Sequence, residues 1–169
     1  MKITLTDENG KSIQLNIADE EYSKLFPAVK KTGYERVKEY ETYYVTCSDI
    51  GCSPMTESPD GLPNYFYINA NYYSSKTVAE NNARADKLMR QLRRFAVEHR
   101  EKELEWKNNC SSKFKIVFDQ NDKDIYVDDN QFIQLYGAIY FDTKKIAQLA
   151  IDTFKDELLW YFTEYKDSL

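Results

Sequence analysis

Basic side chains gather in one stretch near the middle of the chain. Six lie between residues 84 and 100: Arg84, Lys87, Arg90, Arg93, Arg94 and Arg100. In a helix, at about 100° per residue, four of them form a stripe on the side away from Leu88, namely Arg84, Lys87, Arg90 and Arg94. Such a stripe can bind phosphate groups or an acidic partner. The alternative is a solvated helix face that the neighbouring glutamates neutralise.

Acidic side chains concentrate further along, where two predicted strands meet. They are Asp119, Asp122, Asp124, Asp128 and Asp129. Carboxylates spaced along strands can imitate nucleic-acid phosphates and occupy the basic groove of a nuclease. Because Asp is also favoured in turns, an ordinary polar turn is the alternative. A calcium loop is disfavoured, since the glycine and glutamate that an EF-hand needs near residues 124 and 130 are absent.

Cysteine and histidine give weak signals for metal binding or nucleophilic catalysis. Cys47 and Cys52 are separated by four residues, which is at the edge of the spacings found in zinc sites. His99 is the single histidine of the chain, and Cys110 is the third cysteine. His99 falls on the apolar face of its predicted helix, so a nucleophilic triad lacks a convincing base. We therefore expect free thiols, no metal, no cofactor and no enzymatic activity.

A repeat organises the elements that must position these residues. Residues 70–80 read ANYYSSKTVAE, and residues 138–148 read AIYFDTKKIAQ. Each copy has an aromatic pair typical of a strand end, then a helix cap, Ser75 or Thr143, and a first helical turn. The repeat predicts that residues 64–85 and 132–153 fold as matching strand-turn-helix units.

Periodicity and turn residues indicate the remaining elements. A hairpin around Asn9-Gly10, with a type I′ turn, precedes a short helix that Asp19 caps and that ends near Phe26. Further strands are predicted over residues 43–47, 65–69, 113–118, 125–127 and 132–141, a proline-rich surface loop over residues 53–63, and helices over residues 75–103 and after Thr143.

These elements predict an α+β fold. We expect a two-layer domain built from a tandem strand-strand-helix duplication, with both helices on one shared sheet, preceded by the N-terminal hairpin and short helix. The chain of 169 residues suits a single domain, residues 1–169. Its parts are the N-terminal hairpin and helix (1–40), the first repeat unit (41–108) and the second repeat unit (109–169).

Composition narrows the class of protein. The net charge of −5 argues against general affinity for nucleic acid, which needs a basic surface. The 14 tyrosines leave phenol groups for partner contacts. The N-terminal residues lack the apolar region of a signal peptide, and no apolar run approaches the roughly 20 residues of a membrane helix. We expect a soluble, cytoplasmic protein that does not contact membranes.

Several segments together resemble a family of small uncharacterised phage and prophage proteins. They are Tyr72-Tyr73 with the Ser75 cap and Ala79, Leu92–His99, Trp106, Lys113–Ile116, and Gly137–Phe141 with Ile146-Ala147. The likeness covers about residues 43–165. It departs from the family pattern at Ala70, where a glycine is usual, and at Val78, where a capping-box glutamate is usual. The first 38 residues lie outside it. These motifs are structural, so the resemblance assigns no catalytic residue.

The resemblance implies a mobile-element origin, and small phage proteins include inhibitors of host defence, anti-CRISPR proteins among them. The leading hypothesis is therefore a non-enzymatic phage or prophage accessory protein in the host bacterial cytoplasm. It would bind and inhibit a host protein or ribonucleoprotein such as a CRISPR-Cas or other defence nuclease. One alternative is a nucleic-acid-binding protein that uses the basic face of helix 75–103. Another is a structural or self-associating phage protein, and the sequence does not set the oligomeric state.

Overall fold

The computed structural model describes residues 2–6, 8–18, 20–21, 24, 31–47, 51–107, 111–130 and 132–165. Helices and strands occur together, which confirms the predicted α+β class. Contacts divide the chain into two compact units, residues 1–35 and 36–169, and each is described by itself. That both units form a single domain stays a prediction.

The first unit contains the predicted N-terminal hairpin. Strands β1 (Lys2–Thr6) and β2 (Ser12–Asn16) pair antiparallel, with Thr6 opposite Ser12. Residues 7–11 connect them, a longer loop than the two residues of the predicted type I′ turn, and Gly10 supplies a positive φ of 78°. Of the predicted short helix, Glu20, Glu21 and Lys24 are helical, whereas its cap Asp19 and its end at Phe26 lie outside the described residues.

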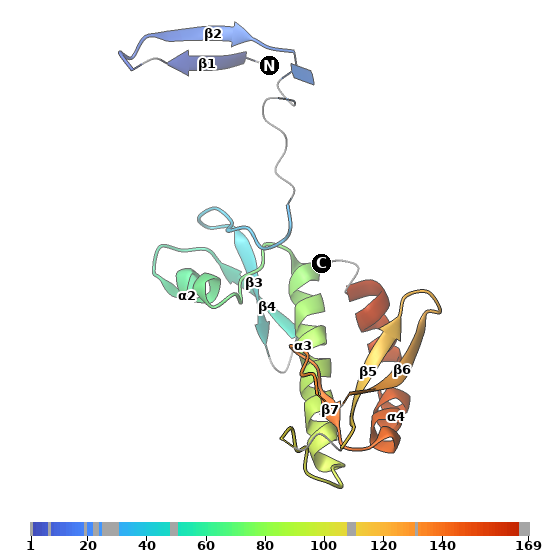
Figure 1. Ribbon diagram of the computed structural model, residues 1–169. Helices are drawn as coiled ribbons and strands as arrows, with labels where there is room; N and C mark the ends of the chain where they lie inside the picture. Colours follow the sequence, from blue (N-terminus) through green and yellow to red (C-terminus); the bar gives the residue numbers. More distant parts are fainter. Residues whose placement is uncertain are drawn as a thin grey trace. The chain divides into compact units, whose positions relative to one another are not determined.

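The first half of the second unit begins with a hairpin. Strands β3 (Thr42–Cys47) and β4 (Gly51–Thr56) pair antiparallel. Helix α2 (Leu62–Ile68) follows, and then Tyr73 forms an isolated antiparallel bridge with Tyr44. The half ends in helix α3 (Lys76–Glu98), the long helix of Figure 1.

The second half repeats the hairpin and the capped helix, but its described residues contain no counterpart of helix α2. Strands β5 (Lys113–Asp119) and β6 (Asp124–Asn130) form a hairpin, and β7 (Tyr140–Phe141) pairs with β5. Helix α4 (Lys144–Thr153) follows, continued by α5 (Lys155–Trp160) and a π-helical turn, η1 (Tyr161–Tyr165). The sheet order is β6-β5-β7, so the chain crosses from one edge of this sheet to the other between β6 and β7.

The two halves match most closely where the sequence repeats. In each, the first hairpin strand pairs on its free side with a short segment that leads into a capped helix. The caps are the predicted ones: Ser75 Oγ accepts from the Val78 N–H at 3.4 Å, and Thr143 Oγ1 accepts from the Ile146 N–H at 3.3 Å. The hairpins lie in separate sheets, however, which corrects the expectation of one shared sheet.

The segments before the two caps differ from the prediction and from each other. Residues 65–69, expected to be a strand, belong to helix α2 and its C-cap, because Gly61 turns the chain at a φ of 86° and Pro63 sits in the first helical turn, where a missing N–H costs nothing. Of the strand expected over residues 132–141, only Tyr140–Phe141 forms. The loop expected over residues 53–63 instead begins within strand β4.

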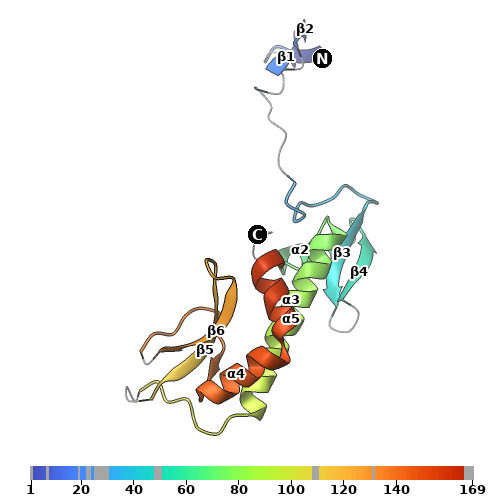
Figure 2. The same cartoon turned by 90° about the vertical axis from the view of Figure 1, so that its right-hand side faces the viewer.

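Helix α3 has two buried faces, and this explains how one helix serves both halves. Leu88 and Leu92 belong to the core of the second half. Ala79 and Ala83 are also buried, and each precedes one of these leucines by nine residues. At about 100° per residue, nine residues place the alanines on the opposite side of the helix. Figure 2 shows the β3–β4 hairpin on one side of the helices and the β5–β6 hairpin on the other.

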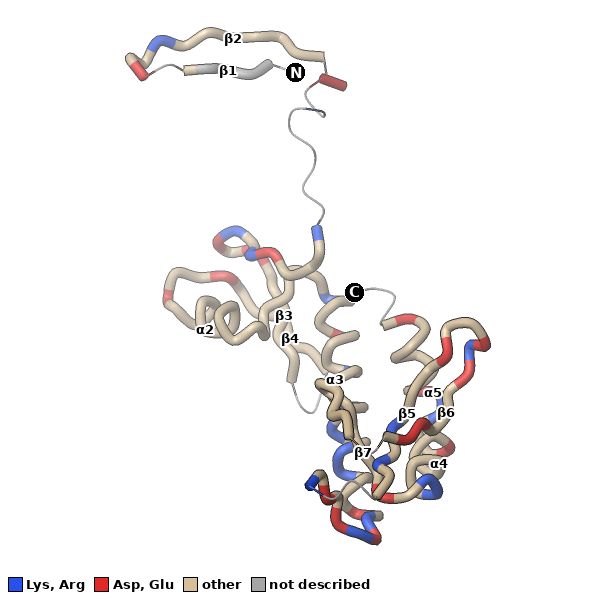
Figure 3. The backbone as a smooth tube through the Cα atoms, in the orientation of Figure 1, with Lys and Arg blue, Asp and Glu red and all other residues tan. Residues whose placement is uncertain are grey.

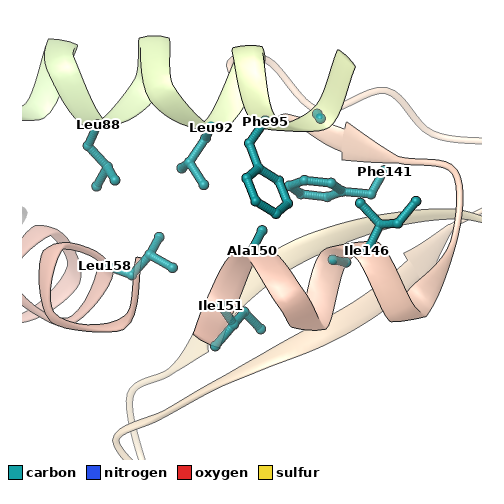
Figure 4. Close-up of a cluster of buried hydrophobic side chains, with 10 residues drawn as sticks. Leu88, Leu92, Phe95, Phe141, Ile146, Ala150, Ile151 and Leu158 are labelled. Carbon is teal, nitrogen blue, oxygen red and sulfur yellow. The ribbon is translucent and has the colours of Figure 1, made fainter. Parts of the chain in front are cut away.

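The main core lies between α3, α4, α5 and the second sheet. In Figure 4 Leu88, Leu92 and Phe95 point from α3 toward Phe141, Ile146, Ala150, Ile151 and Leu158. Phe141 is almost completely buried and enters this core from β7. A smaller cluster of Tyr43, Val45 and Tyr72 forms the core of the first half.

Removing either cap should destabilise the protein. Replacing Ser75 or Thr143 with Ala leaves helix N–H groups without their side-chain acceptor, so each should lower the free energy of unfolding by about 0.5–2 kcal/mol in urea denaturation. Thr77→Ala, an exposed change inside α3, is the control and should have little effect. Losses no larger than that of the control would contradict the assigned caps.

The core of the second half should depend strongly on Phe141. Phe141→Ala empties a buried position and should lower the free energy of unfolding by about 3–5 kcal/mol. Tyr136→Ala removes a fully exposed aromatic four residues from β7 and should change it by less than about 0.5 kcal/mol. Similar effects of the two changes on the urea midpoint would show that the core is not where the structure places it.

Candidate functional site: the apolar loop and the groove beside it

The predicted basic stripe is divided by the fold. Arg84 forms a bidentate ion pair with Glu157, at 2.8 Å and 3.2 Å, and its guanidinium lies 3.9 Å from the centre of the Trp160 ring. Arg84 therefore links α3 to α5, and its role is structural. Arg94 is 3.7 Å from Glu98, while Lys87 and Arg90 are exposed and have no ion pair with a described residue.

The surroundings of the stripe carry both signs of charge. A hollow of about 540 Å³ between α3 and the α4–α5 junction is lined by Arg84, Lys87 and Lys155, and also by Asp152, Asp156 and Glu157. Figure 3 shows Lys and Arg along the lower part of α3, with Asp and Glu close by. Because the acidic groups reduce the positive potential, this surface is poorly suited to a phosphate backbone.

The predicted acidic cluster is also divided. Asp119 accepts hydrogen bonds from the N–H groups of Asn121 and Asp122, as a turn residue does. Asp128 is ion-paired with the buried Lys115 amine. Asp124 and Asp128 share one face of β6 by strand alternation, Asp129 lies on the other face, and Asp122 is an exposed turn residue. For Asp119 this geometry agrees with the alternative interpretation, an ordinary polar turn.

A buried polar cluster, which sequence reasoning missed, joins three parts of the first half. Glu57 is 4% exposed, and its carboxylate accepts hydrogen bonds from Arg36 at 2.7 Å and 3.2 Å and from the Tyr72 hydroxyl at 2.6 Å. The Tyr72 oxygen in turn accepts from the Val37 N–H at 3.1 Å. Glu57 falls in the segment expected to be an exposed loop, and nothing in the sequence marks it as buried.

Burial and hydrogen bonding shift the acid–base properties of this cluster. Burial, with the hydrogen bond to Glu57, raises the pKa of Tyr72 to about 12. Burial alone would raise the pKa of Glu57, but the hydrogen bonds from Arg36 and Tyr72 outweigh it, and this pKa is lowered. The Tyr43 ring stacks on Tyr72 with 4.1 Å between centres, and burial raises its pKa. Arg36, Glu57 and Tyr72 are paired with one another, so we assign the cluster to stability.

A different surface has the character of a binding site. The connection from β6 to β7, residues 132–139, is here called the apolar loop. Phe132 is 66% exposed and Ile133 60% exposed, Tyr136 is fully exposed, and Leu135 is about half exposed. Scattered exposed apolar residues are ordinary, whereas a contiguous group of large ones is characteristic of an interaction site.

Hydrogen bonds hold the apolar loop in one shape. Asn130 Oδ1 accepts from the N–H groups of Phe132 and Ile133, each at 2.9 Å. The Tyr140 hydroxyl accepts from the Leu135 N–H at 2.8 Å and donates to the Ile133 carbonyl at 3.1 Å. Gly137 turns the chain at a φ of 75°. The loop is therefore fixed to β6 and β7 while its apolar side chains face outward.

Two hollows adjoin the apolar loop. One, of about 250 Å³, is lined mainly by apolar side chains, among them Leu88, Leu92, Ile116, Ile139, Phe141 and Leu158. The other, of about 380 Å³, lies between the end of α3 and the loop, and we call it the α3 groove. Arg93 and Val97 line it from α3, Arg100 lines it from just beyond the helix, and Leu135 and Ile139 line it from the loop.

The remaining chemical candidates are not gathered into a site. Strand alternation places Cys47 and Cys52 on opposite faces of their hairpin, and Cys110 lies outside the described residues. His99 stacks on Phe95 at 3.9 Å, and its Nδ1 is 3.0 Å from the Phe95 carbonyl. Among the described residues, no three His, Cys, Asp or Glu side chains are placed to share a metal ion. Within the same residues, no helix is long and apolar enough to cross a bilayer.

Comparisons with protein-family models, with curated proteins and with solved structures gave no match to this chain.

The buried cluster predicts a pH dependence. Unfolded, the Tyr72 hydroxyl ionises near its ordinary pKa of 10, whereas in the folded protein its pKa is about 12. The folded state holds this proton more tightly, so the contribution of Tyr72 is complete below pH 10 and is lost as the pH rises to 12. In urea denaturation at a series of pH values, the free energy of unfolding of the wild type should fall between pH 10 and 12 by up to roughly 2 kcal/mol more than that of Tyr72→Phe.

The same experiment at acid pH tests Glu57, whose pKa is shifted in the opposite direction to that of Tyr72. Because the pKa of Glu57 is lowered from its ordinary 4.5, its contribution is present above that pH and is lost as the pH falls through the folded value. Glu57→Gln should flatten this acid limb. Tyr136→Phe is the control for the alkaline limb, because its ring is fully exposed. Parallel curves for wild type and Tyr72→Phe between pH 10 and 12 would refute the assigned pKa.

Proposed function

We propose that this protein is a non-enzymatic accessory protein that acts by binding a partner macromolecule through the apolar loop. The observation that carries the proposal is the loop itself, in which Phe132, Ile133, Leu135 and Tyr136 face outward on a backbone fixed by Asn130 and Tyr140. An exposed group of large apolar side chains is costly in water unless a partner covers it. Its fixed shape reduces the entropy lost on binding.

The resemblance to phage and prophage proteins supports a more specific form of this proposal. The partner would be a host protein or ribonucleoprotein, such as a CRISPR-Cas or other defence nuclease, and binding would inhibit it in the bacterial cytoplasm. Inhibition by occupying a surface requires no catalytic group.

Nucleic-acid binding is the second candidate function. Lys87 and Arg90 support it, because both are exposed on α3 and neither is ion-paired with a described residue. Arg84 counts against it, since its guanidinium is committed to Glu157 and Trp160. Self-association through the apolar loop is the third, and the exposed aromatic rings of Phe132 and Tyr136 support it.

The leading proposal predicts that capture of a partner depends on the loop. In affinity purification from a bacterial host lysate, Phe132→Ser/Tyr136→Ser should retain about thirtyfold less partner, since truncating a central apolar contact costs about 2 kcal/mol or more. The urea midpoint should be unchanged, because both side chains are exposed. Tyr65→Ser/Ile68→Ser, which alters two exposed apolar residues on α2, is the matched control and should bind as the wild type does.

Other outcomes of this experiment discriminate between the functions. Equal capture by the wild type and the loop variant would remove the apolar loop from the proposal. Nucleic acid as the captured species, lost in Lys87→Glu/Arg90→Glu but not in the loop variant, would favour the second function. A concentration-dependent oligomer in sedimentation, lost in the loop variant, would favour the third.

A further inference from the structure

The end of α3, together with Arg100 just beyond it, presents a face that combines positive charge with an apolar residue. Arg93 and Val97 are four residues apart and lie on one side of α3, and Arg100 follows two residues after the helix ends at Glu98. Val97 is 63% exposed, and both arginines are also exposed. These arginines are not the ones that form the predicted stripe with Arg84.

This face forms one side of the α3 groove. Leu135, Ala138, Ile139 and Tyr140 line the other side, and Leu104 and Trp106 come from the segment after α3. Trp106 meets Tyr140 edge to face, with 4.9 Å between ring centres. Most of the groove surface is therefore apolar, with two guanidinium groups on the helix side.

Both guanidinium groups are available to a partner. No ion pair joins Arg93 to a described residue, and Arg100 is 3.9 Å from Glu103, whose side chain is 86% exposed. A pair at that distance between exposed groups contributes little. An arginine beside an apolar surface favours a partner carboxylate, because the surrounding side chains exclude water and strengthen the interaction.

The groove is less suited to a nucleic acid. Only two arginines line it, whereas Glu98, Glu101 and Glu103 follow closely in the sequence and repel a line of phosphates. The chain as a whole carries a charge of −5. Phosphate recognition relies on many basic groups and little apolar contact, whereas the groove has few basic groups and a mostly apolar lining.

We infer that the α3 groove binds an acidic, apolar peptide segment of the partner protein. The inference rests on the proposed function, since Leu135 belongs both to the apolar loop and to the groove. Arg93 and Arg100 line this groove together with Val97. The segment therefore carries two carboxylates, one for each arginine, and a large apolar side chain to cover Val97.

Selection from a display library of random peptides tests the inference with the full-length protein as bait. The wild type should enrich peptides that combine two Asp or Glu residues with large apolar residues. In fluorescence anisotropy, an enriched peptide should bind Arg93→Glu/Arg100→Glu at least about tenfold more weakly. Selection with this variant should shift the preference toward Lys and Arg. Arg93→Gln/Arg100→Gln, a milder change, should also weaken binding if the double reversal proves poorly folded.

Matched controls separate this inference from its alternatives. Arg90→Glu/Arg94→Glu makes the same charge change elsewhere on α3 and should bind the peptide as the wild type does; an equal loss in this control would overturn the inference. It would also be overturned if no peptide were enriched, or if a single-stranded RNA oligonucleotide competed for the groove at low salt. A dimer abolished by Arg93→Glu/Arg100→Glu would place a second copy there and overturn it too.

Failure of the inference can be distinguished from failure of the proposed function. If the wild type enriches apolar peptides without acidic residues, and Phe132→Ser/Tyr136→Ser loses them, the α3 groove is wrongly assigned while the apolar loop remains a binding site. If the loop variant selects the wild-type peptides with the wild-type affinity, the proposed function fails, and with it the inference that rests on it.

Discussion

The second unit depends on a single helix that must fit two cores at once. α3 presents Leu88, Leu92 and Phe95 to the second half and buries Ala79 and Ala83 on the opposite side. The alanines allow close approach of the first hairpin, whereas the leucines fill the larger space beside α4 and α5. Because both halves pack against one rigid element, the apolar loop and the α3 groove are positioned by the helix as much as by their own strands.

Local patterns predicted the elements that local physics decides. The caps at Ser75 and Thr143, the strand over residues 43–47 and the hairpin over residues 113–127 follow from capping and alternation, which act within a few residues. Tyr65–Asn69 was misassigned because aromatic residues favour strands in general, while Gly61 and Pro63 favour a helix start at this particular point. The second buried face of α3 was missed because alanine gives a weak hydrophobic signal.

The candidate sites were harder to predict because charge in a sequence does not reveal its partners. Arg84 resembles Arg90 in the sequence, yet Glu157 and Trp160, more than seventy residues away, engage only Arg84. The burial of Glu57 depends likewise on Arg36 and Tyr72. The apolar loop could have been suspected from its composition, but its run of apolar residues suggests a buried strand equally well. Only the tertiary structure separates the two.

The Tyr140 hydroxyl links the surface to the interior of the second half. Tyr140 lies in β7, next to Phe141 in the core, and its oxygen makes two hydrogen bonds to the backbone of the apolar loop. The conformation of the loop therefore depends on the folded core, through Tyr140. Without that one oxygen the same apolar side chains would still be displayed, but each encounter would have to freeze several backbone torsions at about 1–2 kcal/mol per residue. Selectivity at this surface would then be limited by chain entropy, even though every contacting side chain was unchanged.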